Sequence, residues 1–321
     1  MSDSSKPPQA LDLRTADGYE LKGFAWRHDP PGNRQRPVVI INAATSVRCE
    51  YYGRFASILH GHGFDVITYD YRGIGNSRPG RLRGFAAGWL EWGQLDFEAV
   101  LQHAAAEYPG QPVQVVGHSV GGFLIGLAPS NARIERVFTV GSQFAYWRDY
   151  LHQRRLGMLL KWHVAMPLLT RVFGYFPGKR LGWMEDTPRG VVRDWTARHA
   201  RFEDAYQRGA HALDAARRQE LVERFAGLRC AMLALSLSDD EFGTVPAVQR
   251  LLRYFRNSRI THLHIEAASL GVPRIGHFAF FHSRYEPALW HIPLEWLRTG
   301  RLPQDARRHV IEPGRNSNAE A

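Results

Sequence analysis

One short stretch of the chain has residue types and spacing suited to nucleophilic catalysis. Gly117-His118-Ser119-Val120-Gly121 lies between the apolar runs VQVV and FLIGLA. G-x-S-x-G between a buried strand and a buried helix is typical of a sharp turn that presents a serine hydroxyl, with glycines where strand and helix cross. The Val120 amide would begin the helix and face negative charge developing beside the serine. We therefore predict Ser119 as a nucleophile and Val120 as an oxyanion donor.

A serine hydroxyl needs a base, and the base needs an orienting carboxylate. On a strand–turn–helix of this kind, the acid and then the histidine follow the serine in the chain. Asp239, Asp240 and Glu241 follow the apolar run LALSL, and we predict Asp240 as the acid, with Asp239 as the alternative. His277 lies in a loop marked by glycine and proline after the last apolar run. It is the predicted base.

The other histidines have simpler interpretations. His118 adjoins the serine and cannot serve it in the required geometry, so a packing or helix-start role is expected. His262 and His264 alternate within one apolar run and share a face, which favours a structural role. No Cys/His spacing resembles a zinc site. We expect neither a metal nor an organic cofactor.

The elements around these residues follow a regular pattern. Helical stretches alternate with apolar runs, which occupy residues 37–43, 64–70, 112–117, 134–142, 230–240 and 260–267. Runs that are apolar throughout are expected for parallel strands covered on both faces. Residues 11–26 instead alternate around Asp17-Gly18, which predicts an antiparallel hairpin. The predicted fold class is α/β.

The strand pattern is interrupted once. Residues 144–227 are helical in composition and rich in aromatic residues and arginine. We predict an α/β core built from 11–143 and 228–300, with 144–227 inserted as a helical lid. Residues 1–10 and 301–321 have the composition of disordered ends.

Four motifs resemble those of the α/β-hydrolase superfamily, in particular its lysophospholipase-like and serine aminopeptidase-like predicted hydrolases: YDYRGIGNS (69–77), GHSVGG (117–122), SDDEFGT (238–244) and GHFAFF (276–281). The resemblance implies a mostly parallel, eight-stranded sheet with helices on both faces and an inserted lid. It also implies cleavage of an ester, thioester or amide bond of an acyl substrate through a Ser-His-Asp triad and an acyl-enzyme intermediate. The polar residues of YDYRGIGNS are expected to stabilise a turn.

The chain departs from the resemblance at one place. Many relatives have His-Gly after the third strand, whereas this chain has Asn42-Ala43-Ala44. The donor at this position is a backbone amide, so the change need not remove the oxyanion hole. Ala44 is the predicted second donor beside Val120.

Two alternative functions stay open at this stage. The same residues could pass the acyl group to an alcohol or amine, which would make the protein an acyltransferase. A hydrolase-like fold could also serve as a binding module with an idle triad. In each case the expected partner is a small-molecule or lipid-like acyl compound.

The amino-acid composition restricts the classes of binding partner and the cellular compartment that we expect for the protein. The net charge is +10, but the arginines are mixed with acids and no nucleic-acid motif accompanies them, so nucleic acid is not an expected partner. Transient contact with an anionic membrane surface stays open. No apolar run approaches the roughly 18 residues of a membrane span, and no signal peptide is recognised. Together with only two cysteines, these observations predict a cytoplasmic protein.

Overall fold

A nine-stranded mixed sheet runs through the centre of the computed structural model, which describes residues 7–29, 36–272 and 274–311. The strand order is β1-β2-β4-β3-β5-β6-β7-β8-β9. The strands are β1 (Gln9–Arg14), β2 (Glu20–Trp26), β3 (Val38–Asn42), β4 (Asp65–Tyr69), β5 (Val113–His118), β6 (Ile134–Val140), β7 (Ala231–Leu237), β8 (Arg259–Ile265) and β9 (Val310–Ile311). From β4 to β8 all neighbours pair in parallel, and β1, β2 and β9 pair antiparallel at the edges.

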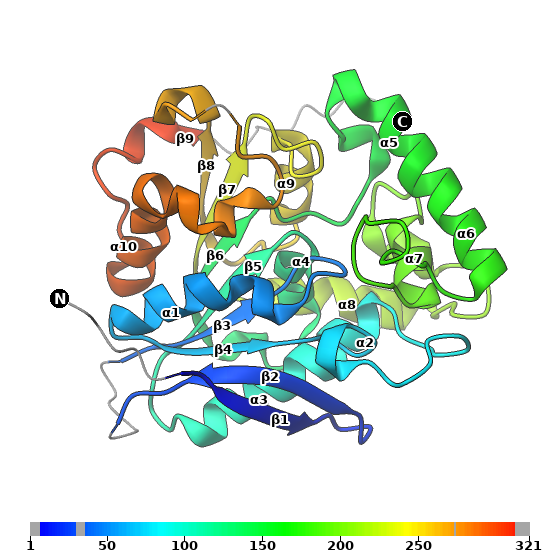
Figure 1. Ribbon diagram of the computed structural model, residues 1–321, viewed down its shortest axis with the longest axis horizontal. Helices are drawn as coiled ribbons and strands as arrows, with labels where there is room; N and C mark the ends of the chain where they lie inside the picture. Colours follow the sequence, from blue (N-terminus) through cyan, green and yellow to red (C-terminus); the bar gives the residue numbers. More distant parts are fainter. Residues whose placement is uncertain (1–6, 30–35, 273, 312–321) are drawn as a thin grey trace.

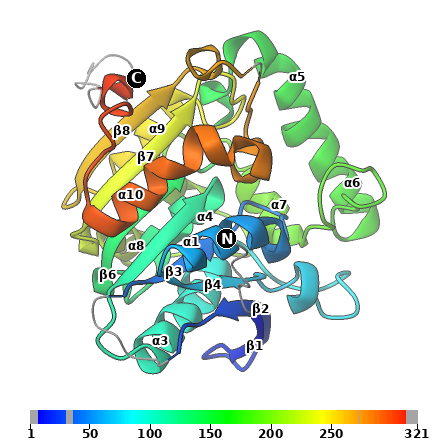
Figure 2. The same cartoon turned by 60° about the vertical axis from the view of Figure 1, so that its left-hand side comes forward.

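Helices cover both faces of the sheet. Figures 1 and 2 show α1 (Gly53–Gly61) and α10 (His291–Thr299) on one face, with α3 (Glu98–Glu107) and α8 (Ala215–Gly227) on the other. The remaining helices are α2 (Trp89–Glu91), α4 (Val120–Leu127), α5 (Arg155–Leu160), α6 (Met166–Phe173), α7 (Arg189–Trp195) and α9 (Val245–Leu252). The α/β-hydrolase fold predicted from the sequence is confirmed.

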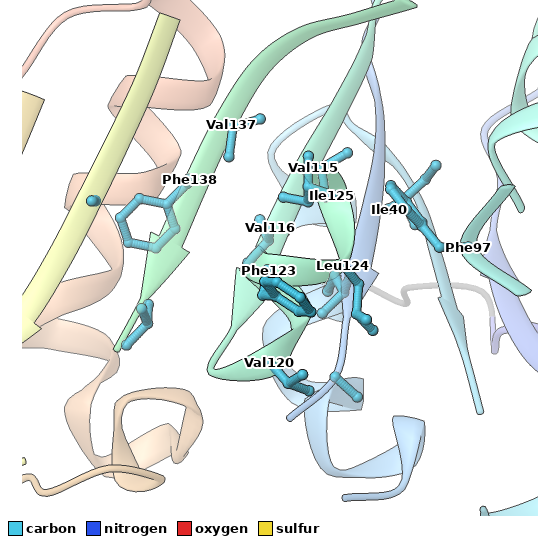
Figure 3. Close-up of a cluster of buried hydrophobic side chains, with 14 of the residues drawn as sticks. Ile40, Phe97, Val115, Val116, Val120, Phe123, Leu124, Ile125, Val137 and Phe138 are labelled. Atoms are coloured by element: carbon cyan, nitrogen blue, oxygen red, sulfur yellow. The ribbon is translucent and has the colours of Figure 1, made fainter. Parts of the chain in front are cut away.

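The central strands are buried along their whole length, which explains their continuous apolar pattern. Every residue of β3, β4 and β5 is buried. Figure 3 shows side chains from β3, β5, β6 and α4 packed into one cluster, among them Ile40, Val115 and Phe123. This packing fixes the ends of β3 and β5, next to the predicted site residues, relative to α4.

Two expectations about the ends of the chain are corrected. The sheet has nine strands and not eight, because β9 pairs with the outer edge of β8 through Ile311 and His262. Residues 301–311 therefore do not belong to a disordered tail. At the other end, β1 begins at Gln9, within the range expected to be disordered. The predictions for 1–6 and 312–321 lie outside the described residues.

The insertion lies between β6 and β7. Its last helix, α8, packs against α4, with the rings of Phe123 and Phe225 5.5 Å apart between centroids. Phe225 is fully buried in the core. The helix α8 therefore belongs to the layer that covers the sheet, whereas α5, α6 and α7 precede it in the insertion. Within the described ranges, no helix has both the length and the apolar character needed to cross a membrane.

The YDYRGIGNS motif forms a turn after β4. The Asp70 carboxylate accepts hydrogen bonds from the amides of Cys49 at 2.7 Å and Asn76 at 2.8 Å. Ser77 Oγ donates to the Asp70 carbonyl at 2.7 Å. The bonds of Asn76 and Ser77 close the turn, and the bond of Cys49 ties the turn to the segment after β3, in line with the structural role expected of the motif.

Candidate active site

Ser119 lies at the junction of β5 and α4. Its backbone has φ 54° and ψ −122°, a left-handed conformation that is unfavourable for a residue with a side chain. The neighbouring Gly121 explains how the turn fits, because a Cβ on it would lie 2.3 Å from the carbonyl oxygen of Asn42. The start of α4 thus touches the end of β3, and this contact allows only glycine. The sharp turn expected around Ser119 is present.

The carboxylate of Asp240 contacts the imidazole of His277. Its two oxygens lie 2.9 and 2.8 Å from His277 Nδ1, and Oδ1 also accepts from the amides of Phe242 and Gly243 at 2.8 and 2.7 Å. Burial raises the pKa of Asp240, but the imidazole and the two amides outweigh it and hold the pKa below its ordinary value. A charged Asp240 can therefore orient His277 so that Nε2 faces away from it.

Asp239, the alternative acid, has other partners. Its Oδ2 accepts from the amides of Ile275 at 2.7 Å and Gly276 at 3.0 Å. The carboxylate therefore holds the backbone just before His277 and does not contact the imidazole. The two neighbouring carboxylates therefore have different partners: Asp239 accepts from backbone amides of the loop before His277, and Asp240 contacts the His277 imidazole.

Gly141, at the end of β6, is a residue whose importance the sequence analysis missed. Its φ is 55°, and a Cβ on it would lie 2.6 Å from Asp240 Oδ2. A side chain there would push the carboxylate away from His277. No motif surrounds this glycine, so only the assembled sheet reveals its role.

Ser119 and His277 line the same cavity of about 150 Å³. No hydrogen bond joins these two described side chains, and catalytic hydrogen bonds of this kind often tighten only when substrate binds. The wall is mostly aromatic and apolar, formed by Trp89, Trp162, Trp183, Met184, Trp195, Phe242 and Phe278. Within the described ranges, no three His, Cys, Asp or Glu side chains are grouped so that they could hold a metal ion.

The two predicted oxyanion donors differ in their availability. Val120 and Ala44 both line the cavity, but the Ala44 amide donates to the Tyr52 hydroxyl at 2.9 Å. This bond already engages the amide and counts against the prediction of Ala44. Thr45, the next residue, also lines the cavity, and among the described residues its amide has no hydrogen-bond acceptor.

The bond to Tyr52 is the start of a buried chain of hydrogen bonds. His118 Nε2 lies 2.9 Å from the carbonyl oxygen of His277, which can only accept, so Nε2 carries the proton. His118 Nδ1 then accepts from the Tyr52 hydroxyl at 2.7 Å, which itself accepts from Ala44. Burial lowers the pKa of His118 to about 3, in keeping with this neutral form. This series of hydrogen bonds connects the loop after β3 to the loop that carries His277.

Replacing Tyr52 by phenylalanine is expected to lower the free energy of unfolding by about 1–3 kcal/mol, because it leaves the Ala44 amide and His118 Nδ1 buried without a partner. Urea denaturation measures the change. Tyr51 is a matched control, since its hydroxyl also makes a hydrogen bond, in this case to the carbonyl of Phe278, but the residue is exposed. Tyr51→Phe should cost less than about 0.5 kcal/mol. Equal costs for the two variants would contradict the role given to the buried chain.

Acid should weaken the fold through His118. Its pKa is about 3 in the folded protein and 6.5 ordinarily, so between these values only the unfolded chain binds the proton. The free energy of unfolding then falls with falling pH, by about 1.4 kcal/mol per pH unit for this one group. We expect His118→Gln to lose this part of the slope in denaturation series at several pH values. All other groups titrate in both the wild type and the variant. If the two proteins showed the same dependence of unfolding free energy on pH, His118 would not be the group responsible.

The sequence comparisons place this arrangement in a family. A family model described as serine aminopeptidase, S33, matches residues 33–236, more than half of the chain. The chain belongs to the serine aminopeptidase S33 family of α/β-hydrolases. In this S33-family chain the matched range includes Ser119 and ends just before Asp239 and Asp240. The comparison with curated proteins gave no match.

Solved structures support the fold of this S33-family hydrolase. It is similar to an esterase from Pyrococcus furiosus, with a TM-score of 0.55, 13% identity, and coverage of 92% of this chain and 91% of the esterase. A Paleococcus ferrophilus monoacylglycerol lipase gives a TM-score of 0.53, 14% identity, and coverage of 92% and 100%. A cold-adapted esterase from an Arctic intertidal metagenomic library gives 0.52, 14%, and 94% and 97%. At these identities the likeness concerns the fold alone.

Proposed function

We propose that this S33-family protein hydrolyses an ester bond of an apolar acyl substrate, with Ser119 as nucleophile, His277 as base and Asp240 as the orienting acid. The observation that carries the proposal is the shared cavity. Ser119, held at a positive φ, and His277, held by Asp240 at 2.8 Å, line one wall of it. A serine, a histidine and a carboxylate in contact with that histidine are the residue types on which acyl transfer through serine depends, which supports the proposal.

In the proposed reaction, His277 Nε2 takes the proton of Ser119 as the serine oxygen attacks the ester carbonyl carbon. The tetrahedral oxyanion is held by the amides of Val120 and Thr45, each worth about 3 kcal/mol of transition-state stabilisation. The imidazolium then protonates the departing alcohol and leaves an acyl-serine. Water, deprotonated by His277, attacks this acyl group; the bond to Ser119 then breaks, the imidazolium returns the proton to the serine oxygen, and the acid is released. Asp240 stabilises the imidazolium in both halves.

The cavity wall supports an apolar acyl group as the part of the substrate that is buried. Four tryptophans line it, and three of them, Trp162, Trp183 and Trp195, come from the insertion. Segment 144–214 is therefore proposed as a lid whose aromatic side chains cover the acyl chain. Lys161, also on the wall, is suited to a negatively charged part of the substrate, as in a lysophospholipid.

The proposal is tested with a fluorophosphonate probe and a panel of p-nitrophenyl esters of increasing chain length. Labelling of Ser119, located by mass spectrometry, and turnover of the esters are expected. Absence of both would favour the non-catalytic binding module. Adding acceptor alcohols tests the acyltransferase alternative, because transfer would yield a new ester in place of the free acid.

The cytoplasm remains the proposed compartment. Cys49 and Cys230 are both buried and unpaired, as expected for thiols in a reducing environment. Burial raises the pKa of Cys230 to about 12, which makes this thiol unreactive.

A further inference from the structure

The insertion contains a helix that packs with one face and leaves the opposite face bare. The helix α5, a π-helical turn at Lys161–Ala165 and α6 follow one another without interruption from Arg155 to Phe173. Figures 1 and 2 both show this helix as a column along one edge of the molecule. Its packed face consists of Met158, Trp162, Met166 and Thr170, all buried.

The bare face carries an apolar stripe at every fourth position. The exposed fractions are 69% for Leu156, 55% for Leu160, 38% for Val164, 60% for Leu168 and 70% for Val172. In a pure α-helix, each step of four residues would rotate the stripe by about 40°. The wider π turn in the middle takes more residues per turn and counteracts this drift. The five side chains, the lid stripe, therefore stay on one side of the helix.

The stretch of sequence that carries the lid stripe has charged side chains of one sign only. Residues 150–184 contain no Asp or Glu and six cationic side chains: Arg154, Arg155, Lys161, Arg171, Lys179 and Arg180. Arg154 and Lys179 pair with acids outside this segment. Arg171 and Arg180 are exposed and have no carboxylate within 4 Å among the described residues. Two copies meeting face to face would bring these cations together unpaired, whereas an anionic surface would neutralise them.

The helix that carries the lid stripe also contributes to the cavity wall. Lys161 and Trp162, on the same helix, line the cavity wall. Beside them Trp183 and Phe278, also on the wall, are 37% and 41% exposed. Tryptophan and cationic side chains next to exposed leucines are the residue types that lie in the headgroup region of a bilayer.

We propose that the lid stripe docks on the surface of an anionic lipid bilayer. The leucine and valine side chains enter the boundary between headgroups and acyl chains, and Arg171 and Arg180 bind the lipid phosphates. The helix lies in the plane of the interface, with its packed face toward the protein. Delivery of an acyl ester from the bilayer to Ser119 rests on the proposed function, but the docking itself does not.

The experiment is co-sedimentation of the full chain with vesicles of phosphatidylcholine alone or with about 30% phosphatidylglycerol. The wild-type chain is expected to bind the anionic vesicles at least about tenfold more strongly than the neutral ones, and high salt should weaken this binding. The variant Leu160→Gln/Leu168→Gln/Val172→Gln, with three exposed side chains replaced, should lose at least about tenfold in binding. Val310→Gln is the matched control, since Val310 is 44% exposed but lies on β9.

Arg171→Glu/Arg180→Glu separates charge from apolar contact, because it should weaken binding to anionic vesicles only. Wild-type binding by the triple variant, or equal binding to neutral and anionic vesicles, would overturn the proposal. A third outcome would also overturn it: the wild-type chain binds no vesicles but forms dimers, and the triple variant is monomeric. The lid stripe would then be a contact between two copies of the chain. Hydrolysis of a soluble short-chain ester, measured in the same samples, reports the proposed function separately. A chain that hydrolyses this ester but binds no vesicles contradicts the docking alone.

Discussion

Replacing Ser119 by alanine is expected to lower kcat/KM for ester hydrolysis by about 10⁵- to 10⁶-fold, because in the proposed reaction the acyl intermediate forms on the hydroxyl oxygen of Ser119. Ser119 is nearly buried, with 5% exposure, and alanine removes only the hydroxyl oxygen. The fold and the unfolding transition should therefore be preserved. Initial rates with p-nitrophenyl esters, beside circular dichroism, measure both effects.

The double variant Ser119→Ala/His277→Ala sharpens this expectation. If the two residues act as one unit, removing the imidazole from a protein that already lacks the serine should cost almost nothing more. Losses that multiply would mean that His277 acts on the substrate independently of Ser119. A single variant that retains more than about a hundredth of the wild-type rate would place the nucleophile elsewhere.

Replacing Asp240 by asparagine is expected to lower kcat/KM by about 10⁴-fold. Asparagine keeps the size of the side chain but removes the charge that stabilises the imidazolium of His277. Its amide can also favour the tautomer that carries the proton on Nε2, which cannot accept the serine proton. The rate should stay low up to high pH, since no titration restores the lost carboxylate.

Asp239→Asn is the matched control for this prediction. It changes the neighbouring carboxylate in the same way but alters only the acceptor of the Ile275 and Gly276 amides. An amide oxygen can still accept these bonds, so a loss of about tenfold or less is expected. If Asp239→Asn proved the more damaging change, Asp240 would be the wrong acid.

The sequence allowed the fold to be predicted because its information is local. Runs such as PVVIINA and FDVITYD are apolar throughout, and that pattern depends only on burial of both faces of a strand. Ser119, His277 and the acidic pair could be located for the same reason, since each follows a strand that ends at one edge of the sheet. The chemistry assigned to them is tested by the variants above.

What the sequence did not reveal depends on contacts between distant segments. The engagement of the Ala44 amide requires Tyr52 to fold back over the loop after β3. The clash that would follow a side chain at Gly141 involves Asp240, about a hundred residues later. The packing of α8 in the core depends on the contact between its Phe225 and Phe123 of α4, which lie far apart in the sequence. The edge strand β9 is only two residues long, too short for periodicity to reveal.

The buried chain from Ala44 to His277 also has a consequence for how the protein can evolve. Tyr52 donates to His118, and His118 has one nitrogen left for the carbonyl of His277. Loss of either side chain leaves the other buried without its hydrogen-bond partner. A mutation at one position is therefore tolerated best when the second position changes with it. Tyr52 and His118 lie 66 positions apart in the chain, yet they should be inherited as a pair. Among descendants of this sequence, a phenylalanine at 52 should coincide with an apolar residue at 118.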